Sequence, residues 1–365
     1  MDHRGRQKSL KESLVRNRLD ALLITHLPNI RYLCGFSGSA GAVLLSPAKS
    51  VLFTDGRYTA QARAEVQGAR IVIGRKAPHM AAAQWLTANR SSLGSKSPWR
   101  VGIEGEHLTV AARCRLAGIL PSKFRLREAP ALVEQARMVK DAEEIERIRA
   151  AVALGASLFD QAVQAIRPGV RETEVAAEME YAARRAGAEE MSFPTIIASG
   201  SRSAQPHGRA SGATIPGEGF VVCDFGVILA GYCSDMTRTV YVGRPTAEAR
   251  RFYQVVREAQ QAAIETVKPG VSVGEVDQAA RKLLRKQGLG KYFTHSTGHG
   301  VGLEIHEAPR LAAGQAEALR PGMVVTIEPG AYIPGKWGVR IEDMVLVTER
   351  GYEVLTPTSK ALIAV

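Results

Sequence analysis

One segment of the chain occurs twice: IRPGVRETEVAAEMEYAARRAGAE at residues 166–189 and, in diverged form, VKPGVSVGEVDQAARKLLRKQGLG at residues 267–290. Both copies contain Pro-Gly-Val, then Glu-Val, then a late Gly, at an offset of 101 residues. Each copy reads as a Pro-Gly turn that leads into a helix closing on Gly. A repeat of this kind predicts two related α+β halves. Because fused halves pack about a pseudo-twofold axis, a site on that axis receives equivalent residues from each.

The repeat continues downstream and aligns acids with acids. FVVCDFG at residues 220–226 matches VVTIEPG at 324–330, and GYCSD at 231–235 matches GVRIE at 338–342. Asp224 therefore aligns with Glu328. Asp235 aligns with Glu342. Each acid lies in or beside a strand-like apolar run, where burial of a carboxylate is costly unless the group is paired or metal-bound. The four acids together indicate a shared metal site, although any one alone reads equally as a turn carboxylate.

The stretch HSTGHGVGLEIHE at residues 295–307 contains three histidines, two glutamates and three glycines. Glycine at alternate positions argues against a helix, and histidine and carboxylate are metal-binding side chains. His299 and His306 are seven residues apart, so on one continuous strand they would point to opposite faces. Either they have different roles or the backbone bends between them. The alternative for this stretch is a glycine-rich turn with surface histidines.

His299 adds a nitrogen ligand to the four acids. Four carboxylates carry a charge of about −4, which two divalent ions would neutralise. A ligand set of mostly oxygen with one imidazole suits Mn²⁺ or Co²⁺ better than a thiolate zinc site does. The sequence therefore predicts a dinuclear centre.

The first third of the chain alternates strand-like and helical patterns, which predicts a mixed sheet with packed helices. Apolar strand-like runs occupy residues 21–25, 42–46, 50–54 and 70–74, and helical patterns occupy 58–65 and 80–88. A long amphipathic helix is expected at 141–166. We therefore expect two domains, residues 1–133 and 134–365.

The net charge of +12 arises entirely from residues 1–135, which hold 21 Lys and Arg against 9 Asp and Glu. Such a basic region can bind nucleic acid, but no recognised nucleic-acid motif accompanies it, so a solvated basic face is preferred and nucleic acid is not an expected partner. No apolar run has the length of a membrane span, and no signal-peptide pattern is present. The four cysteines form no CxxC pair, so a cytoplasmic location is expected.

The chain resembles the M24 metallopeptidases of the pita-bread fold, in the aminopeptidase P/prolidase branch. The residues that carry the resemblance are the histidine stretch 295–307 and the segments PNIRYLCGFSGSAG (28–41) and TDGRY (54–58). It implies an α/β N-terminal creatinase-like domain and an α+β pita-bread catalytic domain with an internal pseudo-twofold repeat. In relatives the first domain often caps the site of a neighbouring subunit, so a homodimer is expected.

The resemblance also implies the metal ligands: Asp224, Asp235, His299, Glu328 and Glu342. Asp235 and Glu342 would bridge both ions, as befits a symmetry pair. Asp224 would complete one ion, and His299 with Glu328 the other. Creatinase shares the fold without this metal set, so retention of all five ligands argues against creatinase activity.

Further roles follow from the same resemblance. His207, in QPHG, matches a histidine that stabilises the tetrahedral intermediate, and His306 matches one near the scissile peptide. His295 matches a residue of the proline pocket, Arg340 matches one that orients the substrate, and Glu328 would also pass a proton to the leaving nitrogen. Two alternatives remain open: a plain loop histidine at His207, and a structural ion pair at Arg340.

The expected activity is that of an Xaa-Pro aminopeptidase, a metallopeptidase that hydrolyses the bond before proline in peptides of three or more residues. The segments GFSGSAG and TDGRY favour it. The close alternative is an Xaa-Pro dipeptidase (prolidase), which requires a free carboxylate on the proline. A different class is a catalytically silent pita-bread binding module, which loss of ligands would favour. The expected cofactors are two divalent ions, Mn²⁺ first, with Co²⁺ or Zn²⁺ as alternatives.

Overall fold

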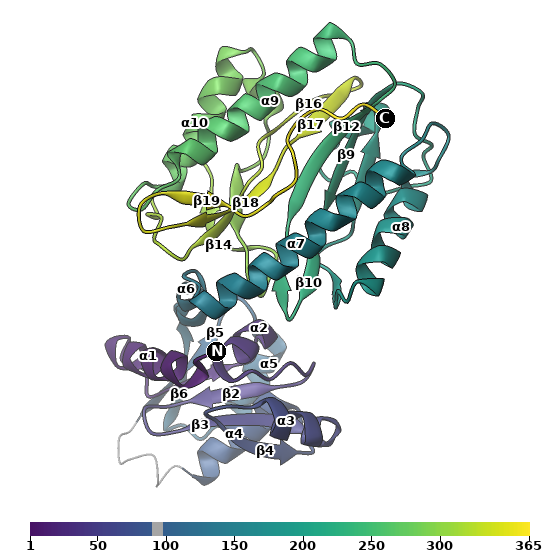
Figure 1. The fold of residues 1–365 in the computed structure, drawn as a ribbon. Helices are drawn as coiled ribbons and strands as arrows, with labels where there is room; N and C mark the ends of the chain where they lie inside the picture. The colour runs from purple at the N-terminus through teal and green to yellow at the C-terminus, as the bar shows by residue number, and fades with distance from the viewer. Residues whose placement is uncertain (90–97) are drawn as a thin grey trace. The chain divides into compact units, whose positions relative to one another are not determined.

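The computed structural model describes residues 1–89 and 98–365, which form two compact units, Met1–Arg137 and Met138–Val365 (Figure 1). The first unit ends four residues after the boundary expected at residue 133, and its last residue, Arg137, donates to the side chain of Asn29 (2.7 Å). Among the described residues, none of the helices has both the length and the apolarity needed to cross a bilayer.

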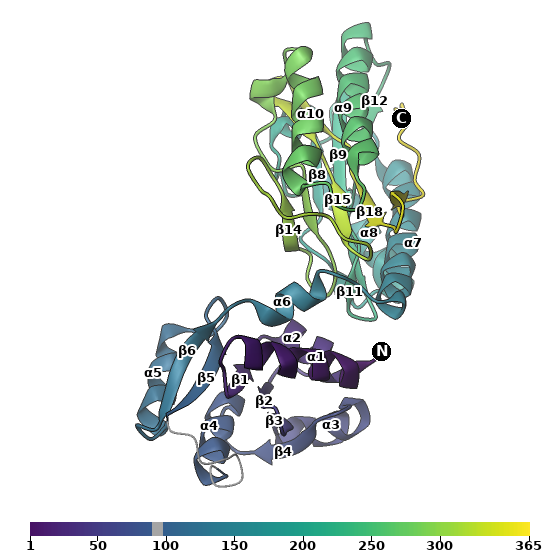
Figure 2. The same ribbon diagram turned by 90° about the vertical axis from the view of Figure 1, so that its left-hand side faces the viewer.

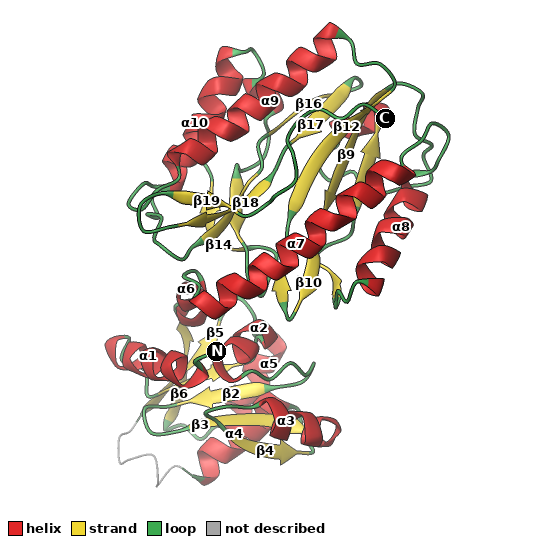
Figure 3. Ribbon diagram, viewed as in Figure 1, coloured by secondary structure: helices red, strands yellow, loops and turns green. Residues whose placement is uncertain are grey.

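The first unit is built on a six-stranded sheet in the order β4-β3-β2-β1-β5-β6, with helices around it (Figure 3). Its strands are β1 (Ala21–Ile24), β2 (Ala42–Leu45), β3 (Ser50–Asp55), β4 (Arg70–Gly74), β5 (Trp99–Glu104) and β6 (Phe124–Ala129). Its helices are α1 (His3–Arg16), α2 (Leu27–Cys34), α3 (Thr59–Glu65), α4 (Pro78–Ala88), α5 (Val110–Ile119) and α6 (Leu132–Arg137). The β1–β2 and β2–β3 pairs are antiparallel and the other pairs parallel. The predicted mixed sheet is therefore confirmed.

The second unit consists of two halves of similar composition. The first half holds α7 (Ala142–Ala165), α8 (Glu172–Arg185), β7 (Glu190–Met191), β8 (Ile196–Ser199), β9 (Gly219–Phe225), β10 (Val227–Leu229), β11 (Tyr232–Cys233) and β12 (Met236–Val242). The second holds α9 (Ala247–Thr266), α10 (Val273–Lys286), β13 (Gly298–Gly300), β14 (Glu307–Leu311), β15 (Val324–Ile327), β16 (Gly330–Ile333), β17 (Trp337–Arg340), β18 (Asp343–Val347) and β19 (Tyr352–Val354). The main sheets run β12-β9-β8 and β14-β13-β15-β18-β19. Figures 1 and 2 show them alongside the helices of the same unit.

The repeat is visible in backbone geometry. The Pro-Gly turns place Gly169 at φ 83° and Gly270 at φ 84°, both in the left-handed region. Each turn leads into a helix whose N-cap amide donates to the glutamate three residues later, Arg171 to Glu174 (3.2 Å) at α8 and Ser272 to Glu275 (2.9 Å) at α10. At α10 the hydroxyl of Ser272 also accepts from the amide of Glu275, which completes a capping box. Both helices then end at a further left-handed glycine, Gly187 or Gly288. Equivalent residues thus form equivalent structures in the two halves.

Apolar faces of the helices bury against the sheets of their own half, as expected for amphipathic helices on a core. In the first half the buried cluster includes Phe159, Met179, Val221 and Val240. In the second it includes Ile264, Leu284, Val325 and Val345.

Residues 358–365 return to the first half and pair with β12. The amide of Tyr241 donates to the carbonyl of Ile363 (2.9 Å), and the amide of Val365 donates back to Tyr241 (2.9 Å). The buried guanidinium of Arg238 donates to the carbonyls of Thr358 and Ser359. Hydrogen bonds therefore hold residues 358–365 against β12 of the first half.

Replacement of either turn glycine by alanine is expected to lower the free energy of unfolding by about 1–2 kcal/mol. A Cβ at Gly169 or Gly270 meets no atom within 4 Å, so the cost comes from the positive φ alone and should be similar at the two sites. Urea denaturation measures it. Gly212→Ala, at an exposed glycine of ordinary φ with equally open surroundings, is the control. Unequal losses at the two turns would contradict their equivalence.

Candidate metal centre

Two antiparallel strand pairs, one in each half, position the four acids at corresponding strand ends. Asp224 lies near the end of β9, and Asp235 immediately precedes β12. In the second half, Glu328 immediately follows β15, and Glu342 immediately precedes β18. The acids therefore meet where the two hairpin-like pairs face each other.

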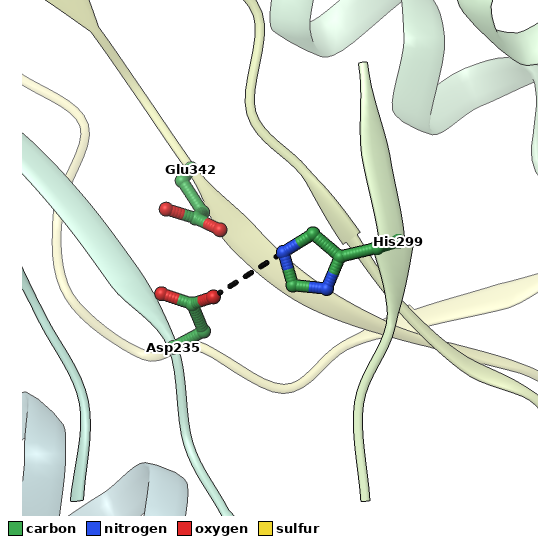
Figure 4. A group of neighbouring side chains, drawn as sticks. All are labelled: Asp235, His299 and Glu342. Atoms are coloured by element: carbon green, nitrogen blue, oxygen red, sulfur yellow. Dashed lines mark ion pairs between the residues drawn. The ribbon is translucent and has the colours of Figure 1, made fainter. Parts of the chain in front are cut away.

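Asp235, His299 and Glu342 offer ligand atoms that all lie within 4.8 Å of one another (Figure 4). The Nε2 atom of His299 lies 3.6 Å from Asp235 Oδ2 and 3.5 Å from Glu328 Oε1. Its Nδ1 lies 3.0 Å from the carbonyl of Gly300, to which it can donate. That bond fixes the tautomer in which Nε2 keeps its lone pair, as metal-binding histidines require.

Several carboxylate oxygens of this cluster have no protein partner. Across the described residues, Asp224 Oδ1, Asp235 Oδ1 and Glu342 Oε1 are buried without a hydrogen bond. Unpaired buried acceptors are rare because desolvation is then uncompensated. Three such oxygens directed to one cluster, beside a neutral imidazole, fit the coordination of divalent cations.

The electrostatics agree with a cation site. Burial, and then repulsion from other acids of the cluster, raises the pKa of Asp235 and of Glu342 well above the usual range. Burial raises the pKa of Glu328 to about 8, although Arg340 opposes the change. Burial, then the nearby His306, lowers the pKa of His299 to about 4. The imidazole is thus neutral, while the acids lack the positive charge that would let them ionise together.

Close backbone approach explains two of the three alternate glycines of residues 295–307. A Cβ on Gly298 would lie 1.9 Å from the carbonyl oxygen of Thr326, and one on Gly300 would lie 2.3 Å from that of Ala308. The register of β13 with β14 also shifts between His299 and Gly300. The backbone therefore bends, and the ring of His306 lies 4.4 Å from that of His299, centroid to centroid.

The cluster opens into a cavity of about 760 Å³ that lies within the second unit. Every residue singled out from the sequence lines it: His207, Asp224, Asp235, His295, His299, His306, Glu328, Arg340 and Glu342. The sequence analysis missed other lining residues, among them Phe193, Ile196, Arg209 and Arg310. These have no motif of their own, and only the folded chain brings them to the cavity.

His295 is engaged on both ring nitrogens. Its Nδ1 lies 2.8 Å from the carbonyl of Ser296, and its Nε2 lies 2.9 Å from the hydroxyl of Tyr332. Burial, then the nearby Arg340, lowers the pKa of His295 to about 3. The neutral ring therefore offers apolar surface to the cavity rather than hydrogen bonds.

Arg340 is buried and donates to four groups of the protein. They are Asp224 Oδ2 (2.5 Å), the Tyr332 hydroxyl (2.7 Å), Thr237 Oγ1 (3.0 Å) and the carbonyl of Pro206 (3.0 Å). This arrangement is that of an internal ion-pair partner, the alternative left open by the sequence. A role in orienting substrate stays a prediction. Tyr332 and Thr237 were not foreseen, because neither belongs to a recognisable metal-binding pattern.

Comparison with known proteins gives two family matches. Residues 146–349 match metallopeptidase family M24, and residues 6–139 match the creatinase/prolidase N-terminal domain. An Xaa-Pro dipeptidase of Pyrococcus horikoshii is 37% identical over 98% of this chain and 98% of its own length. The structure of an Xaa-Pro dipeptidase from Bacillus anthracis superposes with a TM-score of 0.94 at 39% identity, covering 100% of both chains. That of an X-Pro aminopeptidase from Thermotoga maritima gives 0.88 at 35% identity, covering 98% and 99%.

Asp235→Asn should abolish metal binding without unfolding the chain. The amide replaces a carboxyl group whose ionisation burial and the neighbouring acids oppose, so the melting temperature without metal should equal or exceed that of the unchanged protein. For the unchanged protein, Mn²⁺ at a hundred times its Kd should add about 2.7 kcal/mol per site. Differential scanning fluorimetry with EDTA and with Mn²⁺ measures both effects. Glu248→Gln, at an exposed acid, is the control, and an undiminished Mn²⁺ response of Asp235→Asn would refute the site.

Glu328→Gln should stabilise the metal-free protein increasingly as the pH rises. Between the ordinary pKa of 4.5 and about 8, the unfolded chain releases a proton that folded Glu328 retains, so the unchanged protein loses stability with rising pH. The glutamine variant lacks this loss. The free energy of unfolding of the variant, relative to that of the unchanged protein, should grow by no more than about 1.4 kcal/mol per pH unit and level off above pH 8. Urea denaturation in EDTA from pH 5 to 9 measures it; a constant difference would mean that Glu328 ionises normally.

Proposed function

Because this chain belongs to metallopeptidase family M24, we propose that it is an Xaa-Pro dipeptidase, which hydrolyses the bond between a first residue and a C-terminal proline. The observation that carries the proposal is full-length similarity to proteins named Xaa-Pro dipeptidase, in sequence and in structure. The five expected ligands are all present, as a peptidase of this family requires, which disfavours a silent binding module.

In this proposal Asp224, Asp235, His299, Glu328 and Glu342 hold two divalent ions, with Mn²⁺ as the first choice. The unpaired oxygens of Asp235 and Glu342, next to His299, support a shared role for these two acids. When bound, such ions lower the pKa of water and polarise a carbonyl group.

The remaining steps fall to side chains around the cavity. His207 and His306 are exposed to it, where each can donate a hydrogen bond to the carbonyl oxygen of the scissile bond. Glu328 would carry a proton to the proline nitrogen as that nitrogen leaves. His295 would pack its ring against the proline.

Two exposed guanidinium groups support a dipeptide substrate. Arg209 and Arg310 both line the cavity that contains the metal centre. Guanidinium groups bind carboxylates through paired, charge-assisted hydrogen bonds. A dipeptide presents its free carboxylate next to the proline ring, close to the reacting bond, whereas a longer peptide has a neutral amide there. We propose that Arg310 or Arg209 receives this carboxylate.

The Xaa-Pro aminopeptidase favoured by the sequence is the second candidate. Similarity to the aminopeptidase of Thermotoga maritima supports it, but the similarity to proteins named dipeptidase gives the dipeptidase better support. A homodimer, with the first domain of one subunit near the site of the other, remains part of the proposal.

One assay separates these candidates. The purified protein, loaded with Mn²⁺, is offered Ala-Pro, its C-terminal amide and Ala-Pro-Ala. We expect cleavage of Ala-Pro, with kcat/KM at least about tenfold higher than for the amide or the tripeptide, because one charge-assisted hydrogen bond contributes about 1.5–3 kcal/mol. Efficient cleavage of Ala-Pro-Ala would favour the aminopeptidase. Absence of all turnover with Mn²⁺, Co²⁺ and Zn²⁺ would refute both.

The same assay on Arg310→Met and Arg209→Met identifies the carboxylate-binding residue. Loss of that residue should raise KM for Ala-Pro without affecting the amide. The matched Lys variants keep the charge and should recover part of the affinity. If neither Met variant selectively raises KM for Ala-Pro, Arg310 and Arg209 do not bind the substrate carboxylate.

A further inference from the structure

Glu172, on the first turn of α8, is a fully buried acid that does not line the cavity. Its Oε1 accepts from the amide (2.8 Å) and the hydroxyl (2.9 Å) of Ser199. Its Oε2 accepts from the amide (3.2 Å) and the hydroxyl (2.7 Å) of Ser211. The Nε of Arg202 donates to both oxygens, at 3.2 and 3.1 Å. One carboxylate thus binds both ends of residues 199–211.

The segment closed in this way carries three residues of the cavity, Pro206, His207 and Arg209. Arg202 extends the anchoring inward, since its NH2 group donates to the carbonyl of Arg209 (2.9 Å). Apart from a short 3₁₀ turn at Gly200–Ala204, the segment has no regular secondary structure between β8 and residue 211. Its conformation therefore depends on contacts with other parts of the protein.

Two such contacts lie in the middle of the segment. The amide of Gly338 donates to Ser203 Oγ (2.9 Å), and Arg340 donates to the carbonyl of Pro206. The second contact joins the residue before His207 to an arginine that also pairs with Asp224. Glu172 secures the two ends, and these contacts secure the centre.

A buried ion pair is a poor source of stability, because desolvation offsets much of the attraction. The contribution of the carboxylate is a set of directional hydrogen bonds to the two ends of one loop, at Ser199 and Ser211. None of its partners is one of the five metal ligands.

We propose that Glu172 is a positioning residue for peptide hydrolysis, which holds residues 199–211 so that His207 faces the metal centre. The inference rests on the proposed function to the extent that His207 contacts the substrate.

Glu172→Gln preserves the size of the side chain but removes the charge and replaces one acceptor by a donor. It should lower kcat/KM by about tenfold to a hundredfold, mainly through kcat. Mn²⁺ affinity should stay within about twofold of the unchanged protein, since no ligand is touched.

The decisive experiment is a double-mutant cycle on the Mn²⁺-loaded protein, with Glu172→Gln, His207→Ala and the two combined. If Glu172 acts through His207, its substitution should change kcat/KM for Ala-Pro by less than about twofold when His207 is already absent. Glu174→Gln removes an exposed acid from the same helical turn and is the matched control. Equal losses from Glu172→Gln in both backgrounds would overturn the proposal.

Hydrogen–deuterium exchange supplies a readout that does not need turnover. Glu172→Gln should speed exchange in residues 199–211 and leave residues 295–307 unchanged; unchanged exchange in 199–211 would overturn the proposal. Ser211→Ala, which removes a single hydroxyl donor, should act in the same direction and serves if Glu172→Gln does not fold. Failure of the unchanged protein to cleave any Xaa-Pro peptide would refute the proposed function, while this exchange test would still decide whether Glu172 holds the segment.

Discussion

Four carboxylates line one cavity, and their mutual repulsion is the constraint around which the second unit is arranged. Burial raises the pKa of Asp235, Glu328 and Glu342, so the protein alone does not stabilise their ionised forms. Such a cluster is costly to fold. Divalent cations offset this cost when they bind, so the stability of the fold is linked to metal binding.

Each half of the second unit makes hydrogen bonds to an acidic side chain of the other half. The hydroxyl of Thr237, on β12, donates to Glu342 Oε2 (2.6 Å), and the amide of Glu342 donates to the carbonyl of Thr237 (3.1 Å). In the opposite direction, Arg340 of β17 pairs with Asp224 of β9. The centre is therefore assembled only when both halves are folded and docked. The pseudo-twofold repeat supplies the acids, and these crossed contacts fix their geometry.

The sequence was most informative where a physical requirement leaves a local pattern. The Pro-Gly turns, the acids beside apolar strands and the alternate glycines all leave such a pattern. They predicted the repeat and a shared site for the acids, and a bend near His299 was one of the two alternatives that they left open. The edge strand β6 was missed because three of its six residues are charged and exposed, and they do not alternate regularly with apolar ones. Glu172, Thr237 and Tyr332 were missed because their importance lies in hydrogen bonds to residues distant in sequence. The choice between dipeptide and longer substrates depends on the shape and charge of the cavity mouth, which no local pattern records.

The pairing of residues 358–365 with β12 has a consequence for the order in which the molecule can be made. Arg238, beside the acids of the first half, finds the carbonyl of its partner Ser359 only 121 residues later in the chain. During synthesis on a ribosome, β9 and β12 emerge long before the segment that completes their sheet. The edge of β12 therefore lacks this pairing until residues 363–365 have emerged, so completion of the first half depends on a contact of long sequence separation, a kind that forms slowly.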